Sequence, residues 1–189
     1  TLPTTGRAPY PAVVLIGGAG PADRDGTVAG IPMMGHVARD LVAAGFAVVR
    51  YDKRGVGQSG GRAETATLND HADHARAVVV YLQKQRKKDV DGKRIAVLGH
   101  AEGAWVAMRL ATIEKDVAAL VLTGAGSETG GALVLEQQQH LLAAMKVSEA
   151  ERKEKAELQT RINLAATGGG PWDGVPKELR AQAETAWFG

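Results

Sequence analysis

The chain has 189 residues, 44% of them hydrophobic and 23% charged, with a formal net charge of +2, which indicates one globular domain with a core. The charge is small and no basic block is interleaved with aromatic residues, so we expect no nucleic-acid partner. The chain has no cysteine, which excludes disulfides and thiolate metal sites and fits a cytoplasmic and a secreted location alike. No apolar run approaches the roughly 18 residues of a membrane span, so no membrane partner is expected.

The chain opens with two predicted strands separated by a helix. Pro11–Ile16 is an unbroken apolar run that ends in two glycines, which is typical of a strand buried on both faces. Ile31–Ala44 carries apolar residues at helical spacing, and Phe46–Tyr51 is a second buried strand. A glycine-rich loop follows over Arg54–Gly61.

The next segment continues the alternation. A long helix is predicted over Leu68–Lys87, with Thr67 or Asn69 as its N-cap. After it come a strand, a helix and a strand, over Ile95–Leu98, Glu102–Ile113 and Val117–Leu122. Four strands that alternate with helices predict a parallel α/β sheet with right-handed crossovers over residues 1–126.

After residue 126 the pattern is helical only. Ala132–Lys146 is predicted as one helix, and Ser148 begins a capping-box pattern for another. Pro176 suits the first turn of a third helix over Leu179–Ala186. We interpret residues 127–189 as a helical cap of the sheet rather than as an independent domain.

The turn between the third strand and its helix has the form of a nucleophile elbow without a nucleophile. In Gly99-His100-Ala101-Glu102-Gly103, glycines lie two residues on either side of the apex. Such a turn is so sharp that larger neighbouring side chains would collide, and its apex carries roughly 1–3 kcal/mol of backbone strain. Ala101 at the apex cannot attack a substrate. A plain turn with packing glycines is the alternative, and the flanking strand and helix favour the elbow.

A second glycine-rich turn, Gly17-Gly18-Ala19-Gly20-Pro21, follows the first strand. Its unobstructed amides are suited to an oxyanion, with the amide of Glu102 as a second donor at a helix start. If the first strand lies between the second and the third, both turns flank the point where strand order reverses, which is where such sheets bind ligands. A glycine-rich strand exit without a ligand is the alternative.

Three segments together resemble the α/β-hydrolase superfamily. They are VVLIGGAGPADRDG (Val13–Gly26), GFAVVRYDKRGVGQSGG (Gly45–Gly61) and RIAVLGHAEGA (Arg94–Ala104). The most similar branch is the acyl-esterase group related to dienelactone hydrolases, over about residues 3–126, and WDGVPKELRAQAETAWF near the end is similar to the cap of that branch. The resemblance implies an α/β-hydrolase fold, with a partial, doubly wound parallel sheet and a helical cap.

The resemblance also implies the roles of residues in the two turns. Ala101 falls where the family has its nucleophilic serine, and Ala19 and Glu102 fall where its oxyanion amides lie. Asp52–Ser59 matches a structural turn whose charges we interpret as locking the fold. The implied function is a serine hydrolase of small carboxylic esters, with no metal and no organic cofactor. Candidate substrate-binding residues, for which core packing is the alternative, are Gly18, His100, Leu133, Leu141, Leu142, Met145 and Trp187.

The sequence departs from the family in two ways. Position 101 is not serine. The family places its acid and histidine after later strands, which we expect to lie beyond Gly189, and the only histidine after the elbow, His140, lies in a helical pattern. We therefore expect an inactive fragment or cleaved piece of a longer enzyme, whose partner is the missing remainder of its own fold. An engineered Ser→Ala change, a natural loss and an accidental motif compete as explanations of Ala101, and the strain at the apex favours the first.

Three other functions are weighed against this interpretation. Gly55–Gly60 matches a dinucleotide fingerprint but does not open a helix, so nucleotide binding is not favoured. His71 and His74 have metal-ligand spacing, although a solvated amphipathic helix explains them more simply. A non-catalytic binding protein of the same fold, holding a small ester or lactone, is the serious alternative.

Overall fold

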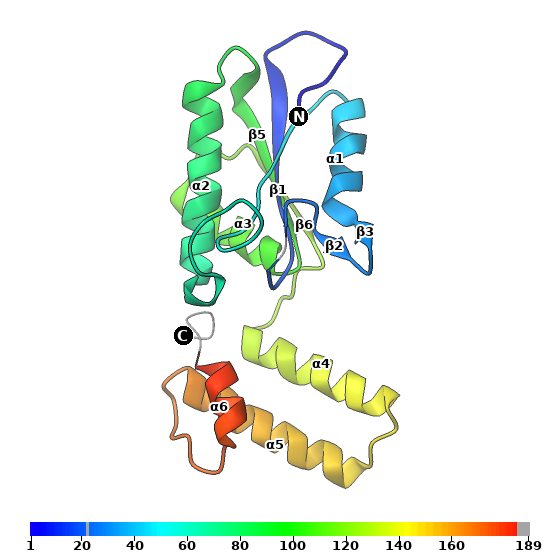
Figure 1. Cartoon of the computed structure of the whole chain (residues 1–189), viewed down its shortest axis with the longest axis vertical. Coiled ribbons are helices and arrows are strands. Elements are labelled where there is room, and N and C mark those ends of the chain that lie inside the picture. Colours follow the sequence, from blue (N-terminus) through cyan, green and yellow to red (C-terminus); the bar gives the residue numbers. More distant parts are fainter. Residues whose placement is uncertain (22, 185–189) are drawn as a thin grey trace. The chain divides into compact units, whose positions relative to one another are not determined.

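The structure is a computed structural model that describes residues 1–21 and 23–184 (Figure 1). These residues form two compact units, of which the first is Thr1–Ala125 and the second begins at Gly126. The first unit contains the sheet, and the described part of the second contains helices only.

The first unit is built on a four-stranded sheet. Its strands are β1 (Tyr10–Ile16), β4 (Ala47–Arg50), β5 (Val90–His100) and β6 (Ala119–Thr123). Their spatial order is β4-β1-β5-β6, and every neighbouring pair is parallel. The predicted parallel sheet is therefore confirmed, with the first strand between the second and the third. Because the chain reverses direction across the sheet at β1, the ends of β1 and β5 flank the switch point.

Helices cover both faces of this sheet, as Figure 1 shows. On one face lies α1 (Met33–Ala43), and on the other lie α2 (Leu68–Gln85) and α3 (Glu102–Ile113). Successive residues of a strand point to opposite faces, so Val13 and Leu15 pack on the α1 side while Val14 and Ile16 pack on the α2 and α3 side.

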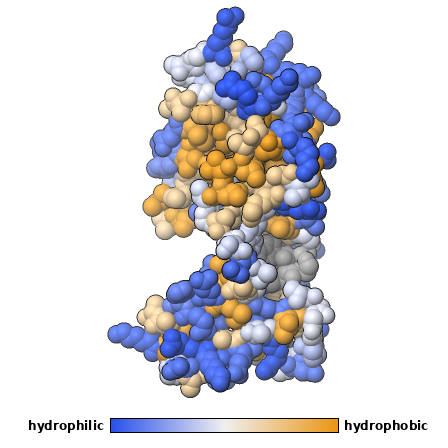
Figure 2. Space-filling view, turned by 180° about the vertical axis from the view of Figure 1, so that it is seen from behind, coloured by the Kyte–Doolittle hydropathy of each residue, from blue (hydrophilic) through white to orange (hydrophobic). Residues whose placement is uncertain are grey.

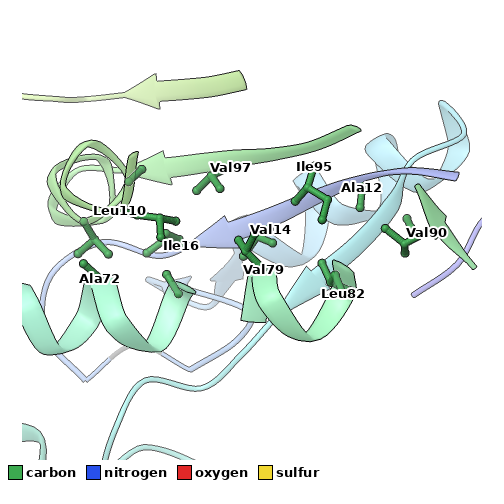
Figure 3. Packing of buried hydrophobic residues seen from close by; sticks show 14 residues of the cluster. Ala12, Val14, Ile16, Ala72, Val79, Leu82, Val90, Ile95, Val97 and Leu110 are labelled. Carbon is green, nitrogen blue, oxygen red and sulfur yellow. The ribbon is translucent and has the colours of Figure 1, made fainter. Parts of the chain in front are cut away.

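Figure 3 shows the larger of the two cores, in which Val79 of α2 faces Val14 of β1 and Leu110 of α3 lies near Ile16. The unbroken apolar run of the first strand is explained by this double burial. Removing each such side chain from water stabilises the fold by about 1.5–3 kcal/mol.

Two elements differ from the sequence-based prediction. The strands β2 (Thr27–Val28) and β3 (Ile31–Pro32) form a small hairpin, so the helix expected from Ile31 begins at Met33. The two residues between these strands, Ala29 and Gly30, both have positive φ, as a tight two-residue turn requires.

The strand β5 is also longer than predicted, because it begins at Val90 rather than at Ile95. Val90 pairs with Tyr10, and the register with β1 shifts before Ala12 pairs with Ile95. The sequence analysis did not predict this first part of the strand because the residues between Val90 and Ile95 are mostly polar.

The helix α2 begins with a complete capping box, which decides between the two candidate caps in favour of Thr67. The Thr67 hydroxyl accepts a hydrogen bond from the Asp70 amide (3.1 Å), and the Asp70 carboxylate accepts one from the Thr67 amide (2.8 Å). The amide hydrogen bond from Thr67 is the main reason that the pKa of Asp70 is lowered. A short 3-10 turn, η1 (Ala63–Thr65), precedes the helix.

The described part of the second unit consists of α4 (Gly130–Ala144), α5 (Glu149–Ala166) and α6 (Lys177–Ala183). The helix α5 is capped by Ser148, whose hydroxyl accepts from the Glu151 amide (3.3 Å), and Pro176 lies just before α6 rather than inside it. The predicted end of that last helix, Ala186, lies outside the described residues. Within them, no helix is long and apolar enough to cross a membrane.

Candidate functional site

The turn at Ala101 has the sharp geometry that an elbow requires. The strand β5 ends at His100 and α3 begins at Glu102, so a single residue joins them. Ala101 has φ 51° and ψ −117°, a conformation that costs an L-residue roughly 1–3 kcal/mol. Its amide donates to the carbonyl of Thr123 (2.9 Å), which ties the apex to the neighbouring strand.

The two glycines beside the apex are required by close backbone contacts. A Cβ at Gly99 would overlap the Gly103 carbonyl and lie 2.7 Å from the Ala104 Cα. A Cβ at Gly103 would overlap the carbonyls of Ile16 and Gly17, the latter at 2.6 Å. Because these obstacles are backbone atoms, they cannot rotate away. The glycines therefore allow the start of α3 to approach the end of β1.

The structure brings the two glycine-rich turns together. A Cβ on Gly18 would lie 3.6 Å from the Ala101 Cβ and 3.7 Å from the His100 ring. A pocket of about 290 Å³ opens beside them. It contains four of the sequence-predicted site residues, Gly18, Ala19, His100 and Ala101, and is completed by Pro21, Gly26, Thr27, Val28, Met33 and Met34.

Sequence reasoning missed one wall of this pocket. Thr27 and Val28 belong to β2, and Met33 and Met34 open α1. The sequence carries only a weak signal for this hairpin, because Gly30 is the one turn-forming residue between two strands of two residues each.

The ring of His100 is held by the neighbouring strand. His100 Nδ1 lies 3.1 Å from the Thr123 hydroxyl oxygen, within hydrogen-bond distance, and the same hydroxyl lies 3.3 Å from the Gly99 carbonyl oxygen. The imidazole is therefore fixed at the edge of the pocket.

Glu102, the residue after the apex, has a buried side chain. Its Oε1 atom lies 2.6 Å from Lys53 Nζ, and the same ammonium donates to the Gly18 carbonyl oxygen (2.5 Å). Only 8% of the Lys53 side chain and 7% of the Glu102 side chain are exposed. Buried His71 lies near this pair; its pKa is lowered chiefly by burial and further by the charge of Lys53.

Asp52 joins the loops that follow β1 and β4. Its carboxylate accepts from the Arg24 amide (2.8 Å), from the Arg24 guanidinium (2.6 and 3.0 Å) and from the Gln58 amide (3.1 Å). The hydrogen bond from the Arg24 side chain is the largest cause of the lowered pKa of Asp52. These contacts agree with the interpretation of this turn as a lock of the fold.

The remaining predicted residues belong to the second unit. Leu141 and Met145 lie on α4 or at its end and are exposed, whereas Leu142 is buried within that unit. His140 is exposed and lies 3.6 Å from Glu136 on the same helix. Trp187 lies outside the described residues.

The segment Gly55–Gly60 and the pair His71 and His74 were weighed above as a nucleotide site and a metal site. Gly55 donates its amide to the Gly60 carbonyl (3.0 Å), so the glycine-rich segment closes on itself and leads to η1. Contrary to the expectation of a solvated face, His71 is buried, with its ring 6.0 Å from that of His74. Among the described residues, no three His, Asp or Glu side chains gather as a metal site.

Known proteins are similar to this chain in part of the sequence and in the fold. Residues 26–163 match the family model described as serine aminopeptidase, S33. The chain is 34% identical over 110 residues to esterase EstD of Thermotoga maritima, and 39% identical over 108 residues to the uncharacterized protein Rv2307c of Mycobacterium tuberculosis. These alignments cover 58% and 56% of this chain but only 26% and 36% of the relatives.

Two solved structures share the fold. The α/β hydrolase GrgF of a Penicillium species superposes with a TM-score of 0.58 at 23% identity, over 76% of this chain and 46% of that one. The 2,6-dihydroxy-pseudo-oxynicotine hydrolase superposes with a TM-score of 0.55 at 23% identity, over 84% and 41%. Since the family model spans most of the sequence and these structures have the same architecture, this chain belongs to the serine aminopeptidase S33 family of α/β hydrolases.

Proposed function

We propose that this chain is the elbow-bearing part of a serine hydrolase of carboxylic esters and that, with alanine at position 101, it is itself inactive. The observation that carries the proposal is the conformation of Ala101, at positive φ between β5 and α3 and beside Gly18. A strained apex has a chemical benefit when it lifts a nucleophile above the sheet, and alanine gains none from it.

The proposed chemistry assigns one role to each part of the site. A serine at position 101 attacks the acyl carbonyl, and the amides of Ala19 and Glu102 hold the oxyanion that forms. A histidine oriented by an acid, both outside this chain, takes the serine proton and then gives it to the leaving alcohol. Loss of the nucleophile accounts for the proposed inactivity, since the same loss in the serine protease subtilisin lowers kcat by a factor of about 10⁶.

The esterase relative supports an ester substrate, while the family description names an aminopeptidase. The same serine and the same backbone N–H donors can act on an ester or on a peptide substrate. An esterase and an aminopeptidase therefore differ in the leaving group and in how the substrate is held. Leu141 on α4 and Met145 at its C-terminal end are large apolar side chains left exposed, and we propose them as contacts for an apolar part of the substrate.

We also propose that β6 pairs with the remainder of the fold. Among the described strands, β6 pairs with β5 alone, and its residues Val121 and Leu122 are exposed. Figure 2 shows a broad hydrophobic area on the first unit. An apolar strand edge is a template for a further strand, and pairing would supply the later elements that carry the acid and the histidine.

The test restores Ala101→Ser in the complete protein and offers three reagents. These are a short-chain p-nitrophenyl ester, an amino-acid p-nitroanilide and a fluorophosphonate probe. The proposal expects ester hydrolysis and covalent labelling, both absent before the substitution. Hydrolysis of the anilide alone would assign a peptidase, and a folded variant with neither hydrolysis nor label would contradict the proposal.

A non-catalytic binding protein is the second candidate, because the pocket beside Ala101 is formed although the nucleophile is absent. In that case the unsubstituted chain binds a small ester, measured by titration calorimetry, and Ala101→Ser leaves it without hydrolytic activity.

A further inference from the structure

One buried charged group near the elbow has no part in the proposed chemistry. Lys53 follows β4 in the sequence, and its ammonium bridges the two turns, with the Gly18 carbonyl oxygen at 2.5 Å and Glu102 Oε1 at 2.6 Å. Both side chains of the ion pair are more than nine-tenths buried. A buried ion pair contributes little to stability compared with apolar residues of the same volume, so stability alone is a weak reason for this one.

The bond from Lys53 to Gly18 has a consequence for the next residue. The Gly18 carbonyl and the Ala19 amide belong to one peptide unit, which is planar and trans, so the C=O and N–H bonds point in opposite directions. By holding the carbonyl, Lys53 turns the Ala19 N–H away from itself. Ala19 lines the pocket beside Ala101 and Lys53 does not, so this direction leads toward the pocket.

The second bond from Lys53 acts on the other turn. Glu102 is the first residue of α3, and its side chain is anchored by the same ammonium that anchors Gly18. Lys53 thereby holds the loop after β1 and the start of α3 at a fixed distance from each other. The amides of Ala19 and Glu102 lie on these two segments.

We propose that Lys53 is a positioning residue, which orients the Ala19 and Glu102 amides as a pair of oxyanion donors; this assignment rests on the function proposed above. Lys53 touches no reacting atom. Its effect is on the direction of two N–H bonds, and that direction can be measured in the chain as it stands, independently of catalysis.

The first experiment measures N–H residual dipolar couplings by NMR in the unsubstituted chain and in the double variant Lys53→Met, Glu102→Gln. This variant keeps the side-chain volumes and leaves no unpaired buried charge. The proposal expects the couplings of Ala19 and Glu102 to change while those of core strand β1 stay the same. Unchanged couplings at Ala19 in the folded double variant would overturn it.

The matched control is a second ion pair at the opposite end of α3, between Arg76 and Glu114 (3.4 Å). The variant Arg76→Met, Glu114→Gln removes it in the same way and is expected to leave the Ala19 coupling unchanged. If the Lys53 double variant does not fold, Glu102→Gln alone is used. The single variant preserves the hydrogen bond from Lys53 to the Gly18 carbonyl. The dipolar coupling of Ala19 should therefore keep its value while the coupling at position 102 changes, and a change at both positions would contradict the proposal.

The second experiment measures ester hydrolysis in the complete protein with Ala101→Ser. Misaligned oxyanion donors lower kcat, and we expect a decrease of about 10- to 100-fold with KM changed by no more than about twofold. The Arg76 and Glu114 control keeps the parental kcat. If Ala101→Ser alone is inactive, the proposed function fails, and the dipolar couplings still decide the role of Lys53. An unchanged kcat in the Lys53 double variant of an active enzyme would refute the positioning role.

Discussion

The two units of this protein are stabilised in different ways. In the first, a parallel sheet is buried on both faces, and residues such as Val14, Ile95 and Leu110 are fully buried. In the described part of the second, the buried apolar residues are few: Leu142, Ile162, Ala165 and Ala183. Polar side chains take part in its packing, as where Asn163 donates to the Gly131 carbonyl (3.1 Å).

This difference bears on the proposed function. The proposed oxyanion donors would have to be held within fractions of an ångström, and they lie on the unit whose sheet is covered on both faces. The second unit instead leaves large apolar side chains exposed, such as Leu141, Met145 and Leu164. Three comparisons between the units test this difference, and the pH dependence of the first unit tests the charged and buried groups within it.

The largest effect is expected for Gly103→Ala, because the new Cβ would overlap the backbone carbonyls of Ile16 and Gly17. We expect the first unit to lose about 4 kcal/mol or more of its free energy of unfolding, measured by hydrogen exchange of β1 amides. Gly131→Ala in α4 is the control, since the atoms nearest to its Cβ would belong to the movable Asn163 side chain, at 3.1 Å and beyond. A comparable loss in both variants would remove the distinction between the units.

The next effect compares one residue type in the two cores. Leu110→Ala removes a fully buried side chain between α3 and the sheet, and we expect a loss of about 3–5 kcal/mol in denaturant unfolding. Leu142→Ala in the second unit, where the leucine is 9% exposed, is expected to cost about 2 kcal/mol. Equal losses would show that the second unit is packed as tightly as the first.

The stability of the first unit should fall with decreasing pH in two stages. The pKa of His71 is lowered in the folded state, so the unfolded chain takes up the proton first and stability decreases below about pH 6.5. The pKa of Asp52 is lowered as well, so its contribution is present above about pH 4 and is lost on further acidification. Thermal melting from pH 8 down to about pH 1.5 measures both stages.

Two variants separate these stages. His71→Gln should remove the first and Asp52→Asn the second, with the remaining stage unchanged in each case. Loss of both stages in one variant would show that a different group governs the pH dependence.

The smallest effect is expected at the helix caps. Thr67→Ala breaks a capping box with both of its hydrogen bonds formed, whereas Ser148→Ala removes a single hydroxyl acceptor 3.3 Å from an amide. We expect costs of about 1–2 kcal/mol for α2 and about 0.5–1 kcal/mol for α5, measured by hydrogen exchange within each helix. A larger loss in α5 would reverse this order.

Much of the first unit follows from local patterns in the sequence. Apolar runs predicted all four sheet strands, and the run is unbroken in β1 because helices cover that strand on both faces. The helix over Glu102–Ile113 was predicted at its observed bounds. The β2–β3 hairpin was missed because its strands are only two residues long, too short for any periodicity. The start of β5 was missed because Asp91, Gly92 and Lys93 are polar although paired in a strand.

The sequence by itself determined the alternation of strands and helices, the glycines of the elbow and the identity of its apex. Only the tertiary structure decided that Gly18 lies against Ala101, that His71 is buried and that Lys53 joins the two turns. The physical reason is distance along the chain. Glycine spacing is a local signal, whereas Lys53 lies 35 residues from Gly18 and 49 from Glu102, and only the order of strands in the sheet brings these three together.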